Sequence, residues 1–201
     1  MTPTYLWHLP ALVALIGYLL GSIPFGVILT RAAGAGDLRQ IGSGNIGATN
    51  VLRTGRKGLA AATLLLDMLK GTAAVLIAGR IAPGHEVVAA AAAFIGHCYP
   101  VWLGFKGGKG VATFMGLCLA LSPSIALVYA IVWLGLLAGL RISSLAGLAA
   151  AISAPVAAAM FARYDLLALM IGLAGLVVWK HRANIGRLLA GAEPRIGLRR
   201  G

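Results

Sequence analysis

Residues 111–140 read VATFMGLCLALSPSIALVYAIVWLGLLAGL, a run of 30 residues without a charged side chain. A single helix of this length would measure about 45 Å, which is longer than the hydrocarbon core of a bilayer is thick. The Ser-Pro-Ser sequence at 122–124 interrupts the run, and proline ends or kinks a helix. We therefore expect two membrane helices here, over residues 111–121 and 124–140.

The composition of the whole chain agrees with a membrane protein. Of its 201 residues, 60% are hydrophobic and 11% are charged, whereas a soluble domain is closer to half apolar and a quarter charged. A chain of this length cannot bury such an apolar excess, which excludes a water-soluble fold and a disordered chain. The two cysteines, Cys98 and Cys118, lie in apolar stretches, which excludes a disulfide scaffold and a four-thiolate metal site.

Further apolar segments approach or reach the roughly 20 residues that a membrane span needs. They cover residues 6–29, 59–78, 87–103, 145–161 and 166–179. The first has no basic segment before it and no Ala-x-Ala cleavage site, so we expect a retained helix rather than a signal peptide. The sequence thus predicts an all-α polytopic integral membrane protein, a single membrane domain over residues 1–201 with seven transmembrane helices.

The basic residues test this prediction, because cytoplasmic loops carry an excess of Lys and Arg. If seven helices alternate across the bilayer, 14 of the 17 Lys and Arg residues fall on one side. They lie in the loops 31–58 and 104–110, at Arg141 and in the tail 180–201. The other side receives Arg80 and Arg163, and Lys70 lies within the second span. We therefore expect the N-terminus outside and the C-terminus in the cytoplasm, and five longer spans would give the same sidedness.

This distribution also explains the net charge of +12, which alone would suggest a nucleic-acid binder. The bases flank membrane spans, so we expect membrane lipid and no nucleic acid as a partner. Polar and glycine-rich sequence is concentrated on the predicted cytoplasmic side, at residues 41–53, 96–113 and 181–193. Three such patches at one membrane face indicate a functional site built from several chain segments.

The first patch has the composition of an anion site. Glycines at 42, 44 and 47 free the backbone to expose N–H groups, and Arg53 adds a planar fork that suits a phosphate. Neutral hydrogen-bonding side chains lie between them, at Ser43, Asn45, Thr49 and Asn50.

The second patch surrounds Lys106 and Lys109 with glycines and leads into a helix N-terminus, an arrangement that attracts anions. It is not a P-loop, because Gly110 rather than Ser or Thr follows Lys109. The ligand that both patches predict is a phosphorylated small molecule. The alternative is that the glycines only form turns and the bases anchor the protein to anionic lipid headgroups.

Several common catalytic motifs are absent from the sequence. None of the four histidines begins a His-x-x-x-x-Asp motif, and neither a Gly-x-Ser-x-Gly elbow nor a His-Glu-x-x-His motif occurs. The predicted cytoplasmic side holds only two acids, Asp37 and Glu193, which are too few for a two-metal site. We therefore expect no metal and no cofactor. An enzyme with this sequence would depend on charge stabilisation and positioning.

Two charged residues and a histidine near the membrane interior each have two interpretations. Asp67 and Lys70 stand three residues apart in the second predicted span, where unpaired charges are costly. They are either a structural ion pair or a direct substrate contact. His97, which ends the third predicted span, is either a hydrogen bonder that fixes the following loop or a catalytic base.

The third patch offers further candidates. His181 and Asn184 lie one helical turn apart, so both can face one site. Ser143 and Ser144 begin a predicted helix and either cap it or contact phosphate. Glu193, the lone acid among the C-terminal bases, is interpreted as holding the tail in place through an arginine.

These patches closely resemble the motifs of one enzyme family. The matching segments are GSIPFG at 21–26, GSGNIGATN at 42–50 with Arg53, Gly96-His97 with Tyr99-Pro100, FKGGKGVAT at 105–113, and His181 with Asn184 and Arg187. In this order and over nearly the whole chain, they resemble the bacterial acyl-phosphate–glycerol-3-phosphate acyltransferases, the PlsY family.

The resemblance implies an enzyme of the bacterial cytoplasmic (inner) membrane with its active site at the cytoplasmic face. Such an enzyme transfers a fatty acyl group from acyl phosphate to the 1-hydroxyl of glycerol 3-phosphate. The products are lysophosphatidic acid and phosphate, in the first step of phospholipid synthesis. Because acyl phosphate carries a good leaving group, its own oxygens can accept the proton of the attacking hydroxyl. This substrate-assisted route would explain the missing catalytic dyad.

Site residues follow from the resemblance and from the composition of the patches. The catalytic candidates are Ser43, Arg53, Lys109, His181 and Asn184. The candidates for substrate binding are Asn45, Thr49, Lys106, Gly107, Gly108 and Ser144. The backbone N–H groups of Gly107 and Gly108 are expected to hold phosphate or the developing oxyanion.

Two other classes of protein compete with this prediction. A transporter of a small phosphorylated metabolite would place its site near the bilayer midplane between inverted repeats, and the sequence shows no convincing internal repeat. A structural membrane protein would not need glycine-rich anion-binding patches.

Overall fold

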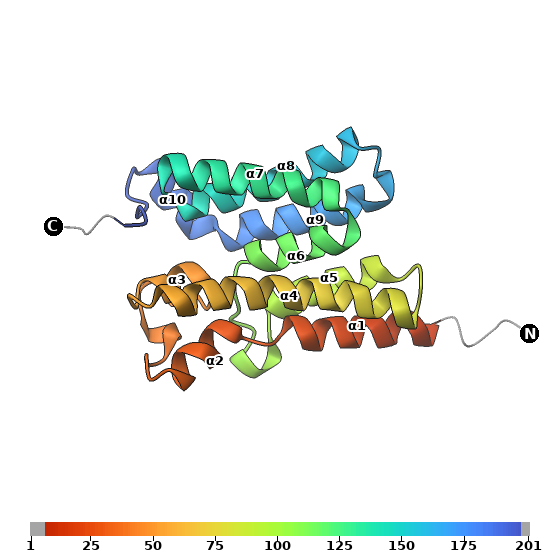
Figure 1. The fold of residues 1–201 in the computed structure, drawn as a ribbon, viewed down its shortest axis with the longest axis horizontal. Coiled ribbons are helices and arrows are strands. Elements are labelled where there is room, and N and C mark those ends of the chain that lie inside the picture. The colour runs from red at the N-terminus through yellow and green to blue at the C-terminus, as the bar shows by residue number, and fades with distance from the viewer. Residues whose placement is uncertain (1–6, 198–201) are drawn as a thin grey trace, which may run out of the picture. The chain divides into compact units, whose positions relative to one another are not determined.

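The computed structural model describes residues 7–197, so the expected span start at Leu6 and the basic residues Arg199 and Arg200 lie outside the described residues. The described chain is helical and contains no β-strand, which confirms the all-α class (Figure 1). It falls into two compact units, with the boundary between Leu121 and Ser122. We call them the N-terminal unit and the C-terminal unit.

The N-terminal unit contains six α-helices and two short 3-10 helices among its described residues. These are α1 (His8–Gly21), α2 (Phe25–Ala32), η2 (Leu38–Gln40), α3 (Ala48–Leu52), α4 (Lys57–Ile81), α5 (Glu86–Cys98), η3 (Val101–Leu103) and α6 (Val111–Leu121). Helix α1 packs against α5 and α4, and α4 also packs against α6. Figure 1 shows α1 and α4 running side by side through this unit.

The C-terminal unit contains four helices among its described residues, α7 (Pro123–Leu140), α8 (Ser143–Met160), α9 (Tyr164–Lys180) and α10 (Arg182–Leu189). The alanine-rich α8 lies between α7 and α9 and packs against both. Ala150, Ala154 and Ala157 of α8 are fully buried. Their small side chains let the neighbouring helix backbones approach α8 closely. By contrast, Leu127 and Ile131 of α7 are each 61% exposed, which suits a helix in contact with lipid.

The observed helices occupy the predicted segments, but their lengths differ. The first predicted span is interrupted at Pro24, which cannot donate a backbone hydrogen bond, so that α1 ends at Gly21 and α2 begins at Phe25. The 30-residue apolar run is divided at Pro123, which starts α7 as expected. Helix α6 has only 11 residues, roughly 16 Å of rise, so it would cross the hydrocarbon core only together with the non-helical residues that flank it.

By length and composition, five segments of the described chain can cross a membrane. They are His8–Ala32, Lys57–Ile81, Glu86–Leu103, Pro123–Leu140 and Ser143–Met160. A sixth follows if α9 and α10, which meet at a bend of 63°, are counted as one broken span. The protein is therefore a multi-pass membrane protein.

Glycine determines how closely the helices of the N-terminal unit approach one another. A Cβ atom at Gly21 of α1 would overlap the backbone of Ala93 in α5. A Cβ atom at Gly116 of α6 would overlap the carbonyl group of Met68 in α4. Thr72 of α4 reinforces the second contact by donating a hydrogen bond to the Gly116 carbonyl at 2.9 Å. Close packing and polar contacts of this kind hold helices together in lipid.

The substitution Gly116→Ala tests this packing. We expect it to lower the melting temperature, because the added methyl group forces α4 and α6 apart, and overpacking of this kind typically costs about 1–3 kcal/mol. The matched control is Gly135→Ala in α7, where a Cβ atom meets nothing within 4 Å. Equal melting temperatures for the two purified variants would contradict the close α4–α6 contact.

Candidate active site

Asn50 organises the first polar patch. Its Nδ2 atom donates to the carbonyl oxygens of Leu38 at 3.1 Å and Ile41 at 2.8 Å. Its Oδ1 atom accepts hydrogen bonds from the Ser43 backbone N–H at 3.2 Å, the Ser43 hydroxyl at 3.4 Å and Arg53 Nη1 at 3.2 Å. We call Ser43, Asn50 and Arg53 the Asn50 cluster. The structure thus brings together two predicted catalytic residues, Ser43 and Arg53, both of which are exposed.

The amide group of Asn50 is used within the loop, so this side chain adds no donor to the expected anion site. Its role is to position Ser43 and Arg53. Gly42 makes this arrangement possible, since it has a positive φ of 55° and a Cβ atom there would lie 2.6 Å from Asn50 Oδ1. Asn45 and Thr49 are half-buried nearby in the chain, before and within α3.

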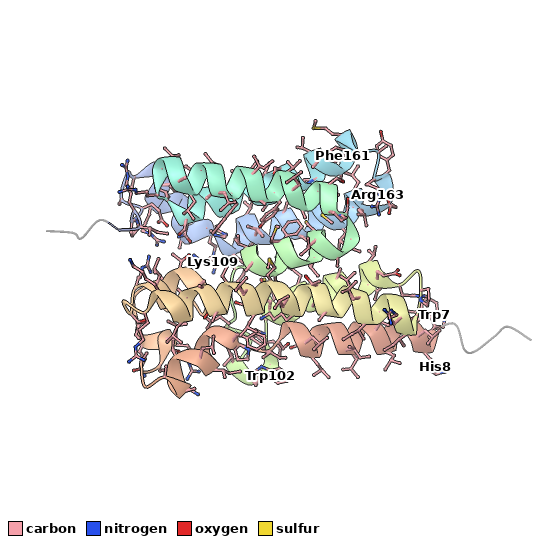
Figure 2. The ribbon with its side chains drawn as sticks, in the orientation of Figure 1. Trp7, His8, Trp102, Lys109, Phe161 and Arg163 are labelled. Atoms are coloured by element: carbon pink, nitrogen blue, oxygen red, sulfur yellow. The ribbon has the colours of Figure 1, made fainter. Side chains whose placement is uncertain are left out.

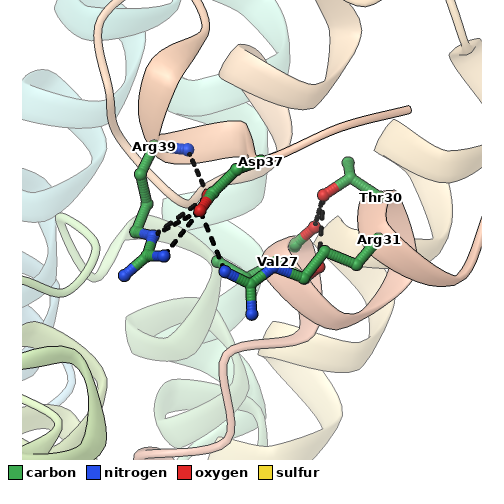
Figure 3. Close-up of polar contacts among 6 residues, drawn as sticks. Val27, Thr30, Arg31, Asp37 and Arg39 are labelled. Carbon is green, nitrogen blue, oxygen red and sulfur yellow. Dashed lines mark hydrogen bonds and ion pairs between the residues drawn. The ribbon is translucent and has the colours of Figure 1, made fainter. Parts of the chain in front are cut away.

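Asp37 is committed to two arginines, as Figure 3 shows. Its Oδ2 atom lies 2.9 Å from Arg31 Nη2 and 2.5 Å from Arg39 Nη2, and its Oδ1 atom accepts the Arg39 backbone N–H at 3.0 Å. The hydrogen bonds from Arg39 and then Arg31 hold the pKa of the Asp37 carboxyl well below its ordinary value. One of the two predicted cytoplasmic acids is therefore an ionised structural group and is poorly suited to act as a base.

The glycine loop, residues 104–110, differs from the expectation in one respect. The Gly107 N–H donates to the Cys98 carbonyl at 3.2 Å, and the Gly108 N–H donates to the His97 carbonyl at 3.0 Å. These two N–H groups are therefore not available for phosphate or an oxyanion in this structure, and that part of the prediction is wrong. They shape the loop instead, while Lys106 is exposed and Lys109 is half-buried. In Figure 2, Lys109 lies toward the α3 end of the N-terminal unit, whereas Trp7 and His8 lie at the other end of this unit, at the start of α1.

Glu193 organises the third polar patch, in the C-terminal unit. Its Oε1 atom accepts hydrogen bonds from Ser144 Oγ at 2.7 Å and Asn184 Nδ2 at 2.5 Å, and its Oε2 atom accepts one from Arg187 Nε at 2.7 Å. We call these four residues the Glu193 cluster. Burial raises the pKa of the Glu193 carboxyl, but the hydrogen bonds from Asn184, Ser144 and Arg187 outweigh burial and leave that pKa below its ordinary value.

The predicted arginine partner of Glu193 is confirmed as Arg187, and two further partners were missed. Ser144 does not cap α8. The N-cap residue is Ile142, and no side-chain hydrogen bond caps this end of the helix. The Ser144 hydroxyl is used by Glu193 instead. The tail is also tied back by the Ile196 N–H, which donates to the Arg141 carbonyl at 2.7 Å.

His181 lies at the bend between α9 and α10 and is 3% exposed. Its Nδ1 atom lies 2.8 Å from the Val177 carbonyl oxygen. A carbonyl can only accept, so Nδ1 carries a hydrogen in this contact. Asn184, one turn along α10, is 6% exposed. In Figure 2, Phe161 and Arg163 mark the turn between α8 and α9 at the far end of this unit from α10.

The two polar clusters and the glycine loop define a class of protein, a membrane-embedded enzyme with basic, glycine-rich segments for an anionic substrate. Comparison with known proteins identifies its family. The family model described as glycerol-3-phosphate acyltransferase matches residues 11–191. The chain therefore belongs to the glycerol-3-phosphate acyltransferase family.

Curated relatives support the same family over nearly their whole length. The glycerol-3-phosphate acyltransferase of Mesorhizobium japonicum is 60% identical over 186 residues, which cover 92% of this chain and 95% of the relative. That of Methylorubrum populi is 58% identical over 199 residues, or 98% of both chains.

Two solved structures of PlsY (YgiH), an integral membrane glycerol 3-phosphate acyltransferase, have the same fold. Its glycerol 3-phosphate form has a TM-score of 0.88 and 42% identity, covering 94% of this chain and 96% of that one. Its lysophosphatidic acid form has a TM-score of 0.85 and 41% identity, covering 94% and 95%. The resemblance inferred from the motifs is thus confirmed. The protein is a membrane-bound glycerol-3-phosphate acyltransferase, and the transporter and the structural protein are no longer alternatives.

The substitution Glu193→Gln tests the Glu193 cluster. It keeps the shape of the side chain but removes the carboxylate that three side chains share, so we expect a lower melting temperature at pH 7 and about tenfold lower acyltransferase activity. The pKa of Glu193 is lower in the folded protein than its ordinary value of 4.5. Its stabilising effect is therefore complete above that value and is lost as the pH falls through the folded pKa.

The measurement compares the melting temperatures of the wild type and Glu193→Gln from pH 7 to pH 3. The difference should shrink at the acid end, and Glu86→Gln, in the first turn of α5, is the matched control. A difference that stays constant over this range would show that the charge of Glu193 is not what stabilises the cluster.

Proposed function

We propose that the acyl donor is acyl phosphate and that transfer occurs in one step. The 1-hydroxyl of glycerol 3-phosphate attacks the acyl carbonyl carbon and forms the new ester bond. The bond between that carbon and the phosphate oxygen breaks, and phosphate leaves. The hydroxyl proton passes to a phosphate oxygen of the donor, so the products are lysophosphatidic acid and hydrogen phosphate. No metal, cofactor or acyl-enzyme takes part in this step.

The substrate-assisted route is supported by the contact of His181 Nδ1 with the Val177 carbonyl, a backbone group rather than a carboxylate. In a catalytic dyad a carboxylate would orient and charge-stabilise the histidine. Here the acids predicted on the cytoplasmic side are committed to other groups, Asp37 to Arg31 and Arg39, and Glu193 to the Glu193 cluster. The donor phosphate, which lies at the reacting carbon, is therefore the proposed proton acceptor.

The charged residues stabilise the phosphates in this proposal. Arg53, Lys106 and Lys109 neutralise the phosphoryl groups of the two substrates and the charge that develops on the leaving phosphate. Ser43, Asn45 and Thr49 add neutral hydrogen bonds. Gly107 and Gly108 shape the loop that carries the lysines, rather than contacting the substrate with their N–H groups.

The residues of the C-terminal unit orient the substrate. His181 contacts a substrate hydroxyl, and Asn184 and Ser144 contribute hydrogen-bonding groups that Glu193 holds in place. Ser43, Arg53, Lys109, His181 and Asn184 are the proposed catalytic residues, because they would contact the reacting groups or the phosphates.

We further propose the membrane arrangement. Seven spans, with α6 as the shortest, place the N-terminus outside and the C-terminus in the cytoplasm of a bacterium. The enzyme then lies in the inner membrane with its active site at the cytoplasmic face. The excess of basic residues in loops 31–58 and 104–110 and in the tail supports this orientation. The acyl chain of the donor would lie among the helices, within the bilayer.

The experiment that tests the reaction combines the purified enzyme with acyl phosphate and glycerol 3-phosphate. We expect equal amounts of lysophosphatidic acid and inorganic phosphate. In parallel reactions, acyl thioesters replace acyl phosphate. Product formed from a thioester but not from acyl phosphate would overturn the proposed donor.

Lys109→Ala tests the proposed phosphate contact. Loss of one charge-assisted hydrogen bond costs about 1.5–3 kcal/mol, so kcat/KM for a phosphorylated substrate should fall roughly ten- to a hundredfold. Lys57→Ala removes an exposed base at the start of α4 and serves as the control. Wild-type kinetics of Lys109→Ala with both substrates would remove Lys109 from the site.

The pair His181→Gln and His181→Ala separates an orienting role from general-base catalysis. Loss of a general base typically lowers the rate 10²- to 10⁴-fold. We expect Gln to retain much more activity than Ala, because its amide can still form a hydrogen bond with the substrate. The measurement is kcat from pH 6 to 9. Equal, near-total losses in both variants, with the pH dependence gone, would make His181 the base.

The orientation is tested with single cysteines in a background that lacks Cys98 and Cys118. Gly58→Cys and Ala192→Cys should react with an impermeant thiol reagent only after the cytoplasmic side is opened. Pro83→Cys, in the turn between α4 and α5, should react in intact cells. All three positions are exposed in the structure. Labelling of Ala192→Cys from outside would contradict the odd number of spans.

A further inference from the structure

The N-terminal unit contains a buried ion pair that the proposed reaction does not use. Lys70 Nζ lies 2.7 Å from Asp67 Oδ1 in α4, and the two side chains are 2% and 4% exposed. Lys70 also donates a hydrogen bond to the Ile23 carbonyl at 2.8 Å, at the break between α1 and α2. Charges within a membrane span are costly, and such residues commonly have a functional role.

His97 connects this ion pair to the glycine loop. The Nδ1 atom of its buried ring lies 3.8 Å from Asp67 Oδ1. The other side of the ring lies against Gly108, where a Cβ atom would overlap Nε2 and would be 2.7 Å from Cε1. The backbone of the same residue also contacts the loop, since the His97 carbonyl accepts the Gly108 N–H at 3.0 Å. The ring is thus placed between the carboxylate and the loop.

The loop needs such support because of its composition. Four of its seven residues, 104–110, are glycine, and glycine restricts the backbone less than any other residue. Yet the loop carries Lys106 and Lys109, whose charges must lie in the right place to act on phosphate. A displacement of about 1 Å at a catalytic group can lower the rate on the order of a hundredfold.

We propose that Asp67, Lys70 and His97 are positioning residues for the glycine loop. The ion pair holds the Asp67 carboxylate beside the His97 ring, 3.8 Å from its Nδ1 atom, and so limits where the ring can lie. The ring and the His97 carbonyl then hold Gly108, and with it the backbone that carries Lys106 and Lys109. This inference rests on the proposed role of the two lysines in binding the phosphorylated substrates.

The first test is a double-mutant cycle between His97 and Gly108. Gly108→Ala alone should lower kcat/KM for at least one phosphorylated substrate roughly ten- to a hundredfold, because its methyl group collides with the ring and displaces the loop. His97→Ala alone should also lower it, whereas His97→Gln should retain more activity. In the His97→Ala background, Gly108→Ala should cost little more, since the colliding ring is absent.

The second test measures the loop itself and does not depend on activity. Trypsin cleaves after Lys106 and Lys109, and the rate of cleavage in detergent-solubilised protein reports how often the loop opens. We expect roughly tenfold faster cleavage at these two sites in His97→Ala and in the double variant Asp67→Asn/Lys70→Met. The double variant avoids leaving one buried charge without its partner.

Thr72→Val is the matched control, because it removes a partly buried hydrogen bond of the same helix, to the Gly116 carbonyl, away from the ion pair. It should lower the melting temperature without accelerating cleavage in the loop. Additive losses in the His97–Gly108 cycle, or unchanged cleavage in a folded His97→Ala variant, would overturn the positioning role. If the wild type makes no product from acyl phosphate, the proposed function fails, but the cleavage assay still decides whether these residues position the loop.

Discussion

A bilayer core contains no water to hydrogen-bond to polar groups, and this constraint determines where the enzyme can place its chemistry. The membrane-crossing segments must be helices that satisfy their own backbone groups. Almost all charged side chains are therefore excluded from the spans and gather in the connecting loops. A reaction between an anionic, water-soluble acceptor and an acyl donor can then be catalysed where helices end and glycine-rich loops begin.

In each polar cluster, one central side chain holds the neighbouring polar side chains in place. Asn50 holds Ser43 and Arg53, and Glu193 holds Ser144, Asn184 and Arg187. Because these central groups are satisfied within the protein, they fix the surrounding side chains in place without binding substrate themselves. Rigid placement of hydrogen-bond donors and positive charges is the main contribution that a protein can make when the acyl donor has a good leaving group, as the proposed acyl phosphate does.

Sequence patterns predicted the helical segments well, since long apolar runs and Pro123 leave few alternatives for the backbone. The motifs around residues 42–50 and 105–113 also predicted the family. Three details depended on folded geometry and could not be read from composition. Asn50 is a polar residue in a polar loop, and only the positions of Leu38 and Ile41 show that it faces inward. Nor does spacing along the chain place the Ser144 hydroxyl beside Glu193, 49 residues away, or the N–H of Gly107 beside Cys98.

The central claim is that acyl transfer occurs in one step without an acyl-enzyme. The most direct measurement incubates the enzyme with acyl phosphate and isotopically labelled inorganic phosphate, in the absence of glycerol 3-phosphate. A covalent acyl-enzyme would release phosphate reversibly and so incorporate the label into acyl phosphate, as in a ping-pong reaction. One-step transfer predicts no incorporation under these conditions, whereas incorporation at a rate comparable to turnover would contradict it.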